Sequence, residues 1–391
     1  MKQNFLHTLS FILISALVTT TYGFHDLPHM LILGIAKQVL IEKDPEIIQI
    51  AEKYFDQFEE PHQKGQVQFE EHSIWSDDIK FLYKSGVKYW DTWHYIDQIY
   101  NPTNYPININ NQKESNSNAQ AAFNQIKETF KNKNLIGKIT VMKHIFLKHL
   151  VHLVGDIHQP LHTVSFFSQK FQNGDLGGNK QMVQLSDSKK NNLHFYFDSG
   201  AFFYTFDDRI HRPFNESFTD YFGNEVERLI KLYPREELKI NDEDVQFDQW
   251  VAESYKISTE QIYTQIDLTG SQKVNKITDE NHLKNQELCQ KQITKAGYRL
   301  ANILEDFLKD EKGIYTFDKE IYQHKTKDKN KVDKTGKTLI AFIIALVLLG
   351  ICLFGCHKNS QNQQKMKQNG NSSSHNESGR HQELQNQSDN F

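Results

Sequence analysis

One short stretch of this chain, HLVGDIHQPLH at residues 152–162, holds three histidines and an aspartate. His152 and Asp156 are four residues apart, and residues at that spacing are neighbours on one face of a helix. A Gln-Pro pair should then turn the chain, so that His162 can reach a second point close to the first. Because imidazole and carboxylate groups together suit zinc, the stretch predicts adjacent metal sites.

A second pair with the same spacing follows in NLHFYFD, where it consists of His194 and Asp198. One such pair is weak evidence, since helices often carry His and Asp four residues apart by chance. Two pairs with a further histidine tied to one of them indicate a metal centre. Upstream, the segments WSD and WHYID supply Asp77, His94 and Asp97 as further candidate ligands or ligand neighbours.

The amino terminus is typical of a secretory signal. Residues 1–23 contain Lys2, an apolar run and small residues before a cleavage point after Gly23. An uncleaved signal anchor is the alternative. Cleavage would leave Phe24 as the first residue, with His29 five positions on. A free terminal amine close to a metal can bind it through nitrogen and through its own carbonyl oxygen.

A membrane span is predicted near the other end. Residues 338–356 are 19 uncharged and mostly apolar residues, enough to cross a bilayer. The basic stalk before them (324–337) argues against a buried core helix, and the polar tail after them (357–391), which we expect to be disordered, argues against a glycolipid anchor. Lysines flank the span on both sides, so the excess of positive charge that normally marks the cytosolic side does not fix its orientation. A cleaved signal would instead carry residues 24–323 out of the cytosol. We therefore expect a single-pass membrane protein of the cell surface or of an endolysosomal or vacuolar lumen.

The cysteine content and the net charge exclude two properties of the exported part, residues 24–323. Cys289 is its only cysteine, because Cys352 and Cys356 lie in the predicted span, so no intrachain disulfide can form there. The net charge of −4 and the concentration of lysines in the stalk argue against a protein that grips duplex nucleic acid with a basic surface. Asn215 is a candidate glycosylation acceptor, as expected of an exported glycoprotein.

The periodicity of the exported part predicts one mainly α domain. Asp26 and Asp44 each precede a proline and an apolar run, as helix N-caps do. Residues 138–157 and 295–308 repeat apolar side chains every three or four positions. Strand-like alternation is rare, and residues 181–185 are the best candidate.

The ordered set of His29, WSD, WHYID, HLVGDIHQPLH, DLGGN and NLHFYFD resembles the single-strand-specific zinc nucleases of fungi and plants. That family includes 3′-nucleotidase/nucleases and is distantly related to bacterial zinc phospholipases C. The segment AGYRLANIL resembles its last helix, so the likeness covers essentially all of residues 24–310. It implies a mainly α, phospholipase C/nuclease-like domain with three zinc ions at the bottom of a cleft.

The resemblance also implies which residues bind each ion. These are, for the first ion, Asp77, His94, His152 and Asp156; for the second, His162, His194 and Asp198; and for the third, the amine and carbonyl of Phe24, His29 and the bridging Asp156. The family usually has Trp where Phe24 stands, but the ligating atoms are backbone. Some members have Asn where Ser199 stands, which puts one substrate contact in doubt.

The expected chemistry is hydrolysis of single-stranded DNA and RNA to 5′-nucleotides, with 3′-nucleotidase activity as a further expectation. Zinc lowers the pKa of water and stabilises charge on phosphate oxygens, so no side-chain base is required. Asp156 would take part as the bridging ligand. Asp97 would orient an imidazole or the attacking water, with a structural hydrogen bond as the alternative.

Other residues have less specific roles. Tyr95 would stack on a nucleobase, unless it is a core residue. Gly177, Gly178 and Asn179 should form a tight turn that lets backbone approach the metals, with Asn179 as a candidate substrate contact. We expect His158 to be a core or supporting residue, and the two histidines at positions 144 and 149 to lie on the surface.

Two other functions are compatible with the same residues. A phospholipase C-like phosphodiesterase would favour Glu where Asp198 stands. A non-catalytic, zinc-stabilised receptor or adhesion domain would tolerate loss of ligands, yet every expected ligand is present. No protein partner can be inferred; the expected partners are single-stranded nucleic acid, nucleotides and the membrane.

Overall fold

The computed structural model of the protein describes residues 24–56, 67–82, 87–107, 117–138, 140–204 and 210–314. The predicted signal (1–23), stalk (324–337), membrane span (338–356) and tail (357–391) lie outside the described residues. Among the helices that the structure describes, none combines the length and apolar character needed to cross a membrane.

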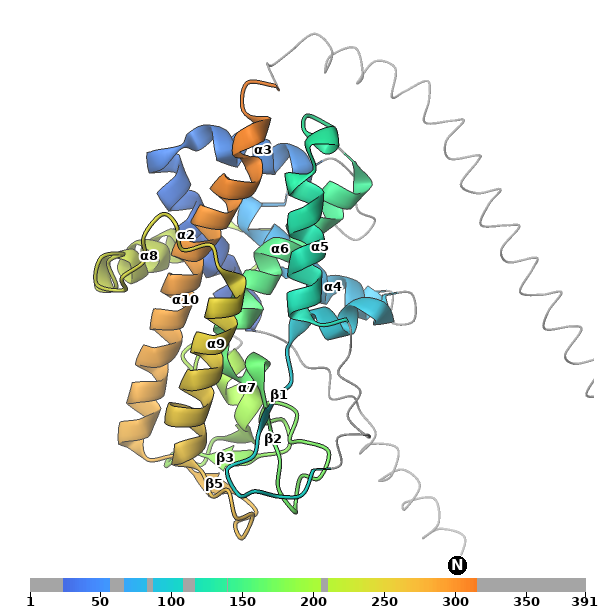
Figure 1. Ribbon diagram of the computed structural model, residues 1–391. Helices are drawn as coiled ribbons and strands as arrows, with labels where there is room; N and C mark the ends of the chain where they lie inside the picture. The colour runs from blue at the N-terminus through green and yellow to red at the C-terminus, as the bar shows by residue number, and fades with distance from the viewer. Residues whose placement is uncertain are drawn as a thin grey trace, which may run out of the picture. The chain divides into compact units, whose positions relative to one another are not determined.

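A long central helix, α6 (Val141–His158), organises the fold (Figure 1). Thr140 caps its first turn by accepting a hydrogen bond from the Lys143 amide, and the helix ends two residues before Pro160. Every residue from 146 to 158 is buried, because α6 is packed on several sides rather than along one stripe. Its polar side chains therefore lie inside the protein.

The longest helix, α10 (Asp279–Leu308), packs along α2 (Asp26–Lys43). Gly297 permits this close crossing, because a Cβ atom there would lie 2.5 Å from a side-chain carbon of Ile35. The pair α2 and α10 also contacts α6, so the three helices form one apolar core with α3 and α5.

Shorter helices and turns complete the domain. The remaining α-helices are α3 (Pro45–Phe55), α4 (Trp75–Leu82), α5 (Ala119–Lys131), α7 (Leu193–Asp198), α8 (Glu216–Leu232) and α9 (Phe247–Ile257). The short turns are η1 (Phe69–Ile74), η2 (Lys88–His94), η4 (Lys133–Leu135), η5 (Pro160–Thr163), η6 (Ser258–Ile262), η7 (Tyr263–Gln265) and η8 (Lys309–Glu311).

The strands are short and gather at one end of the helices, near α7 (Figure 1). β1 (Gln98–Tyr100) pairs in parallel with β2 (Val164–Phe166), with Gln98 opposite Val164. β3 (Met182–Gln184) pairs antiparallel with β4 (Lys190–Asn192) and parallel with β5 (Asn275–Lys276). A second apolar cluster, which includes Cys289 of α10, lies under these strands and α7.

The structure confirms the mainly α prediction in the described residues and places β3 within the predicted strand at 181–185. Asp44 precedes α3 as its N-cap, as expected, although its side chain makes no capping hydrogen bond. The prediction for Asp26 was wrong by one position. The N-cap of α2 is His25, and Asp26 is the first helical residue, where a negative charge complements the helix dipole.

Candidate metal centre

The side chains expected to bind zinc converge at the carboxyl-terminal end of α6. They come from α2, α4, η2, α6, η5 and α7, and none is more than 7% exposed. They are His29, Asp77, His94, His152, Asp156, His162, His194 and Asp198.

Helix geometry brings each predicted pair together. His152 Nε2 lies 3.2 Å from Asp156 Oδ2 on α6, and His194 Nε2 lies 3.6 Å from Asp198 Oδ2 on α7. The turn η5 then carries His162 across to α7, where its Nε2 is 3.1 Å from that of His194. The predicted turn after α6 is therefore confirmed.

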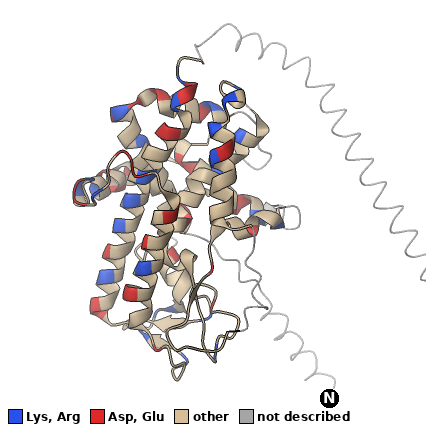
Figure 2. Cartoon of the chain, viewed as in Figure 1, with Lys and Arg blue, Asp and Glu red and all other residues tan. Residues whose placement is uncertain are grey.

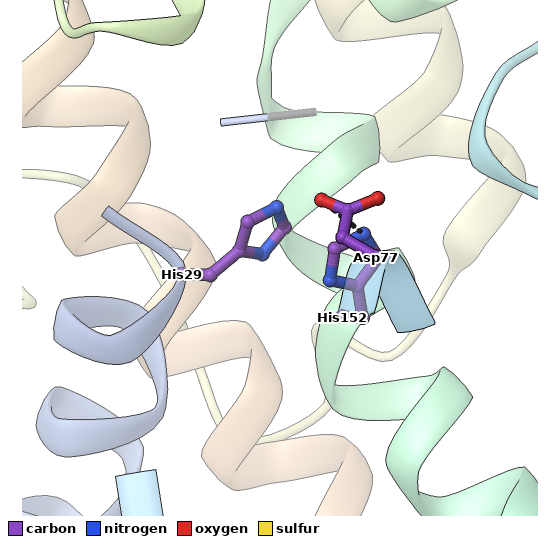
Figure 3. Close-up of side chains that lie close together, drawn as sticks. All are labelled: His29, Asp77 and His152. Atoms are coloured by element: carbon purple, nitrogen blue, oxygen red, sulfur yellow. Dashed lines mark ion pairs between the residues drawn. The ribbon is translucent and has the colours of Figure 1, made fainter. Parts of the chain in front are cut away.

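Within the part of the chain that the structure describes, three sets of three side chains could each hold a metal ion, because their ligand atoms lie within 4.8 Å of one another. One set combines His94, His152 and Asp156, and another combines His162, His194 and Asp198. The third combines His29, Asp77 and His152, whose side chains point toward one another from three helices in Figure 3.

Asp156 stands at the middle of this cluster. Its carboxylate is fully buried, and four imidazole nitrogens surround it: His94 Nδ1 at 2.9 Å, His152 Nε2 at 3.2 Å, His29 Nε2 at 3.5 Å and His162 Nδ1 at 3.8 Å. Neither carboxylate oxygen accepts a hydrogen bond in the described residues. A buried carboxylate without donors is costly unless a cation compensates it.

Backbone carbonyls orient three of the imidazoles. Nδ1 of His152 donates to Ser73 O at 2.7 Å, and Nδ1 of His194 donates to Gly177 O at the same distance. His162 Nδ1 donates to the main-chain oxygen of His94 at 2.6 Å. Each ring therefore turns Nε2 toward the centre, which is the arrangement that metal-binding histidines use. Burial would lower the pKa of His152, but the carboxylates of Asp156 and Asp77 raise it to about 9, so a metal ion binding there would displace a proton.

Burial also shifts the pKa values of other candidate metal ligands. It lowers the pKa of His29 and of His94 to about 4, so both rings are neutral at pH 7 and have a lone pair to offer. Burial raises the pKa of Asp198 well above its ordinary value, and the Asp156 carboxylate adds to that rise. A metal cation close to Asp198 would lower that pKa again, because positive charge favours the ionised carboxylate. Donor type, burial and the unpaired carboxylate all fit zinc.

The predicted amino-terminal ligand lies beside the cluster. Phe24 is fully buried, and its ring meets that of His29 edge to face with centroids 6.4 Å apart. The next amide, His25 N, donates to Asp198 O at 2.9 Å. Arg212 fixes this region from outside, because its guanidinium bonds both Asp26 and Asp78.

The turn that approaches the centre has the predicted form. Gly177 and Gly178 both adopt positive φ, at 58° and 85°, and Gly177 O is the carbonyl that orients His194. The side-chain amide of Asn179 donates to Leu176 O at 2.8 Å, which commits that nitrogen to the turn.

Two predicted residues, Tyr95 and Asp97, follow the candidate ligand His94 closely in the chain. Tyr95 follows His94 directly and is partly exposed, so its ring is not a core residue. The Asp97 carboxylate makes no hydrogen bond to a candidate ligand among the described residues. Asp97 is exposed at the surface, and its pKa is raised, first by partial desolvation and then by the carboxylate of Asp175.

Two expectations about histidines on α6 were wrong. His144 and His149 were expected on the surface, but each is only 3% exposed. His144 Nδ1 bonds to Tyr54 O at 2.6 Å, and His149 Nδ1 lies 2.9 Å from Ser76 Oγ. His158 is a core residue as predicted: its Nδ1 donates to Val154 O and its Nε2 accepts from Arg299.

Several supporting residues escaped the sequence analysis. Gln159 was interpreted only as part of a turn, yet its amide donates to Asp198 Oδ1 at 2.6 Å and its carbonyl accepts from Leu161 N. Lys80 Nζ lies 2.9 Å from Asp77 Oδ1. Its position three residues after Asp77 on a helix is a local signal that could have revealed it. Ser199, at the position where some relatives have Asn, is fully buried and donates to Tyr196 O.

A family model described as S1/P1 nuclease matches residues 24–309, a range that includes every candidate ligand. Among curated proteins, no sequence matches this chain.

Proposed function

The chain belongs to the S1/P1 nuclease family, and from this we propose that it hydrolyses single-stranded DNA and RNA to 5′-nucleotides. Membership makes it a zinc-dependent hydrolase of phosphodiester bonds. We further propose that it removes the phosphate from 3′-nucleotides, since the same centre would bind a terminal phosphate.

The observation that carries this proposal is the environment of Asp156. It is a fully buried carboxylate with four imidazole nitrogens within 3.8 Å and no hydrogen-bond donor of acceptable geometry. Burial alone would raise the pKa of this carboxyl, but His152 and His94 hold it well below its ordinary value, so the cluster keeps a negative charge where the imidazole nitrogens converge. A centre that binds metal cations accounts for it.

We propose three zinc ions. The first would be held by Asp77, His94, His152 and Asp156, the second by His162, His194 and Asp198, and the third by the amine and carbonyl of Phe24 with His29 and Asp156. The third set requires removal of residues 1–23, because an amide nitrogen is a poor ligand compared with a free amine.

When bound, zinc would supply Lewis acidity for the phosphate oxygens and lower the pKa of water. Protein residues would hold the ligands in place and orient the attacking water. The carbonyls of Ser73 and Gly177 hold His152 and His194 in their ligating orientation. We propose that Asp97, three residues after His94 and exposed at the surface, orients the attacking water.

Substrate selection would depend on base stacking more than on charge. Tyr95 is partly exposed next to His94, and a stacked base contributes about 1–3 kcal/mol. Figure 2 shows positively and negatively charged residues interspersed along α9 and α10, rather than the single-sign stripe that tracks a duplex. We therefore propose that a flexible strand, which can bend one phosphate into a buried centre, is the preferred substrate.

The location of the enzyme is also a proposal. A secretory signal at 1–23 and a membrane span at 338–356 would place the catalytic domain outside the cytosol, on a cell surface or in an endolysosomal or vacuolar lumen.

The test uses purified full-length protein from a secretory host. We expect single-stranded DNA and RNA to be cut much faster than duplex DNA, to give 5′-phosphate and 3′-hydroxyl ends, and to be spared after chelation. Products with 3′-phosphates, or faster cleavage of phosphatidylcholine than of RNA, would contradict the proposal. Tight zinc binding with no turnover would indicate a receptor or adhesion role.

A further inference from the structure

His149 occupies an unusual position for an imidazole. Three tryptophans enclose it, and its ring centroid lies 5.3 Å from that of Trp75, 4.9 Å from Trp90 and 5.0 Å from Trp93, all at steep interplanar angles. Nδ1 lies 2.9 Å from Ser76 Oγ. Nε2 has no hydrogen-bond partner in the described structure, although the residue is only 3% exposed.

His94 differs from other candidate ligands in the nitrogen that it turns inward. His152, His162 and His194 each direct Nδ1 outward to a main-chain carbonyl. His94 instead places Nδ1 2.9 Å from Asp156 Oδ2, so its outer nitrogen is Nε2. That buried nitrogen has no hydrogen-bond partner in the described structure.

His94 and His149, each with an unpartnered nitrogen, line the same small cavity, together with Trp93, Leu153 and the candidate ligands His152 and Asp156. The cavity has room for about one water molecule. We propose that His149 is a positioning residue for the metal centre: through one water in this cavity, its Nε2 accepts the hydrogen bond that His94 Nε2–H donates. The inference rests on the zinc ligation by His94 in the proposed function.

The proton positions follow from that ligation. A neutral imidazole carries one N–H, so binding metal through Nδ1 places the proton of His94 on Nε2. His149 must then present an unprotonated Nε2, which puts its own proton on Nδ1, where it donates to Ser76 Oγ. Ser76 immediately precedes the candidate ligand Asp77, so the chain of hydrogen bonds joins the supports of two ligands of the first ion.

Three substitutions of His149 separate packing from hydrogen bonding. His149→Phe keeps an aromatic ring inside the tryptophan cage but has no nitrogen. His149→Asn keeps a polar group near Nδ1, for Ser76, and has none near Nε2. His149→Gln can place its amide near Nε2 and so restores the partner of His94.

The measurement is the zinc affinity of the purified full-length protein, by competition with a chromophoric chelator. Loss of an outer partner typically weakens metal binding about 10–100-fold. We expect that loss for one ion per chain in His149→Phe and His149→Asn, and recovery to within about threefold of wild type in His149→Gln.

The matched control is His144→Phe, on the same helix. His144 is equally buried and bonds to Tyr54 O, away from the ligands, so this variant should lose thermal stability without losing zinc affinity. Wild-type affinity in both His149→Phe and His149→Asn, or His149→Gln as weak as His149→Phe, would overturn the inference and leave the proposed function intact. A wild-type protein that binds no zinc would overturn both.

Discussion

Replacing Gly177 with alanine should weaken binding of the second zinc ion, whose proposed ligands are His162, His194 and Asp198. The added Cβ would displace the backbone that positions two of these ligands. Gly177 has φ of +58°, where a side chain costs about 1–2 kcal/mol. Its added Cβ would lie 2.3 Å from Leu161 O and 3.1 Å from His194 Nδ1, so the Leu161 carbonyl or the turn must move by about 1 Å. That shift displaces His162, which follows Leu161, and the Gly177 oxygen that orients His194. A lost outer hydrogen bond weakens metal binding about 10–100-fold, or about 1.4–2.8 kcal/mol.

Competition with a chelator would measure this loss, and Gly313→Ala is the matched control. Gly313 has φ of +69° and nothing within 4 Å of its added Cβ, so that variant has the backbone strain without the collision. We expect both variants to lower the melting temperature of the metal-free protein, and only Gly177→Ala to release one zinc ion more easily. Equal zinc affinity in the two variants would refute the role assigned to the turn.

Three further predictions concern the ligands, the amino terminus and pH. Asp156→Asn should lower kcat/KM on single-stranded DNA by about 1,000-fold or more, and His158→Ala far less; similar losses would contradict the position given to Asp156. Extra residues before Phe24 should reduce zinc content by one ion per chain in metal analysis, whereas Phe24→Trp should keep it; a full zinc complement in the extended protein would exclude the amine as a ligand. Burial alone would raise the pKa of Glu253, but Arg299 and a neighbouring lysine lower it to about 2, so their ion pairs add stability above about pH 4.5 that is lost as the pH falls toward 2. Glu253→Gln should therefore cost about 1–2 kcal/mol at pH 7 and much less near pH 2 in chemical unfolding, and a cost that does not vary with pH would argue against the ion pairs.

The ligand pairs could be predicted from sequence because their geometry is local. His152 with Asp156, and His194 with Asp198, need only the helical repeat to face the same point. The turn after α6 was also predictable, since proline marks the end of a helix. The convergence of these pairs on one centre followed from the family resemblance rather than from spacing alone.

The environment of α6 was not predictable, because its partners are distant in sequence. Helical periodicity distinguishes one apolar face and leaves polar positions on the supposed surface. In the structure α6 is surrounded, so Lys143 pairs with buried Glu311, 168 residues away, and His149 meets Ser76, 73 residues away. The strands β1 and β2 were missed for a related reason: Gln98 pairs with Val164, 66 residues away, and β2 is buried throughout, so its sequence shows no alternation.

The metal groups draw on residues from position 29 to position 198, whereas the last three long helices, α8 to α10, contribute no candidate ligand. Ions bound there would act as cross-links that close long loops of the chain, which is the role disulfides have in many exported proteins. This domain has one cysteine, Cys289, and it is buried and unpaired. Folding of this domain would thus depend on zinc supply instead of oxidation, and a zinc-starved cell would accumulate a domain whose first two thirds lack their cross-links.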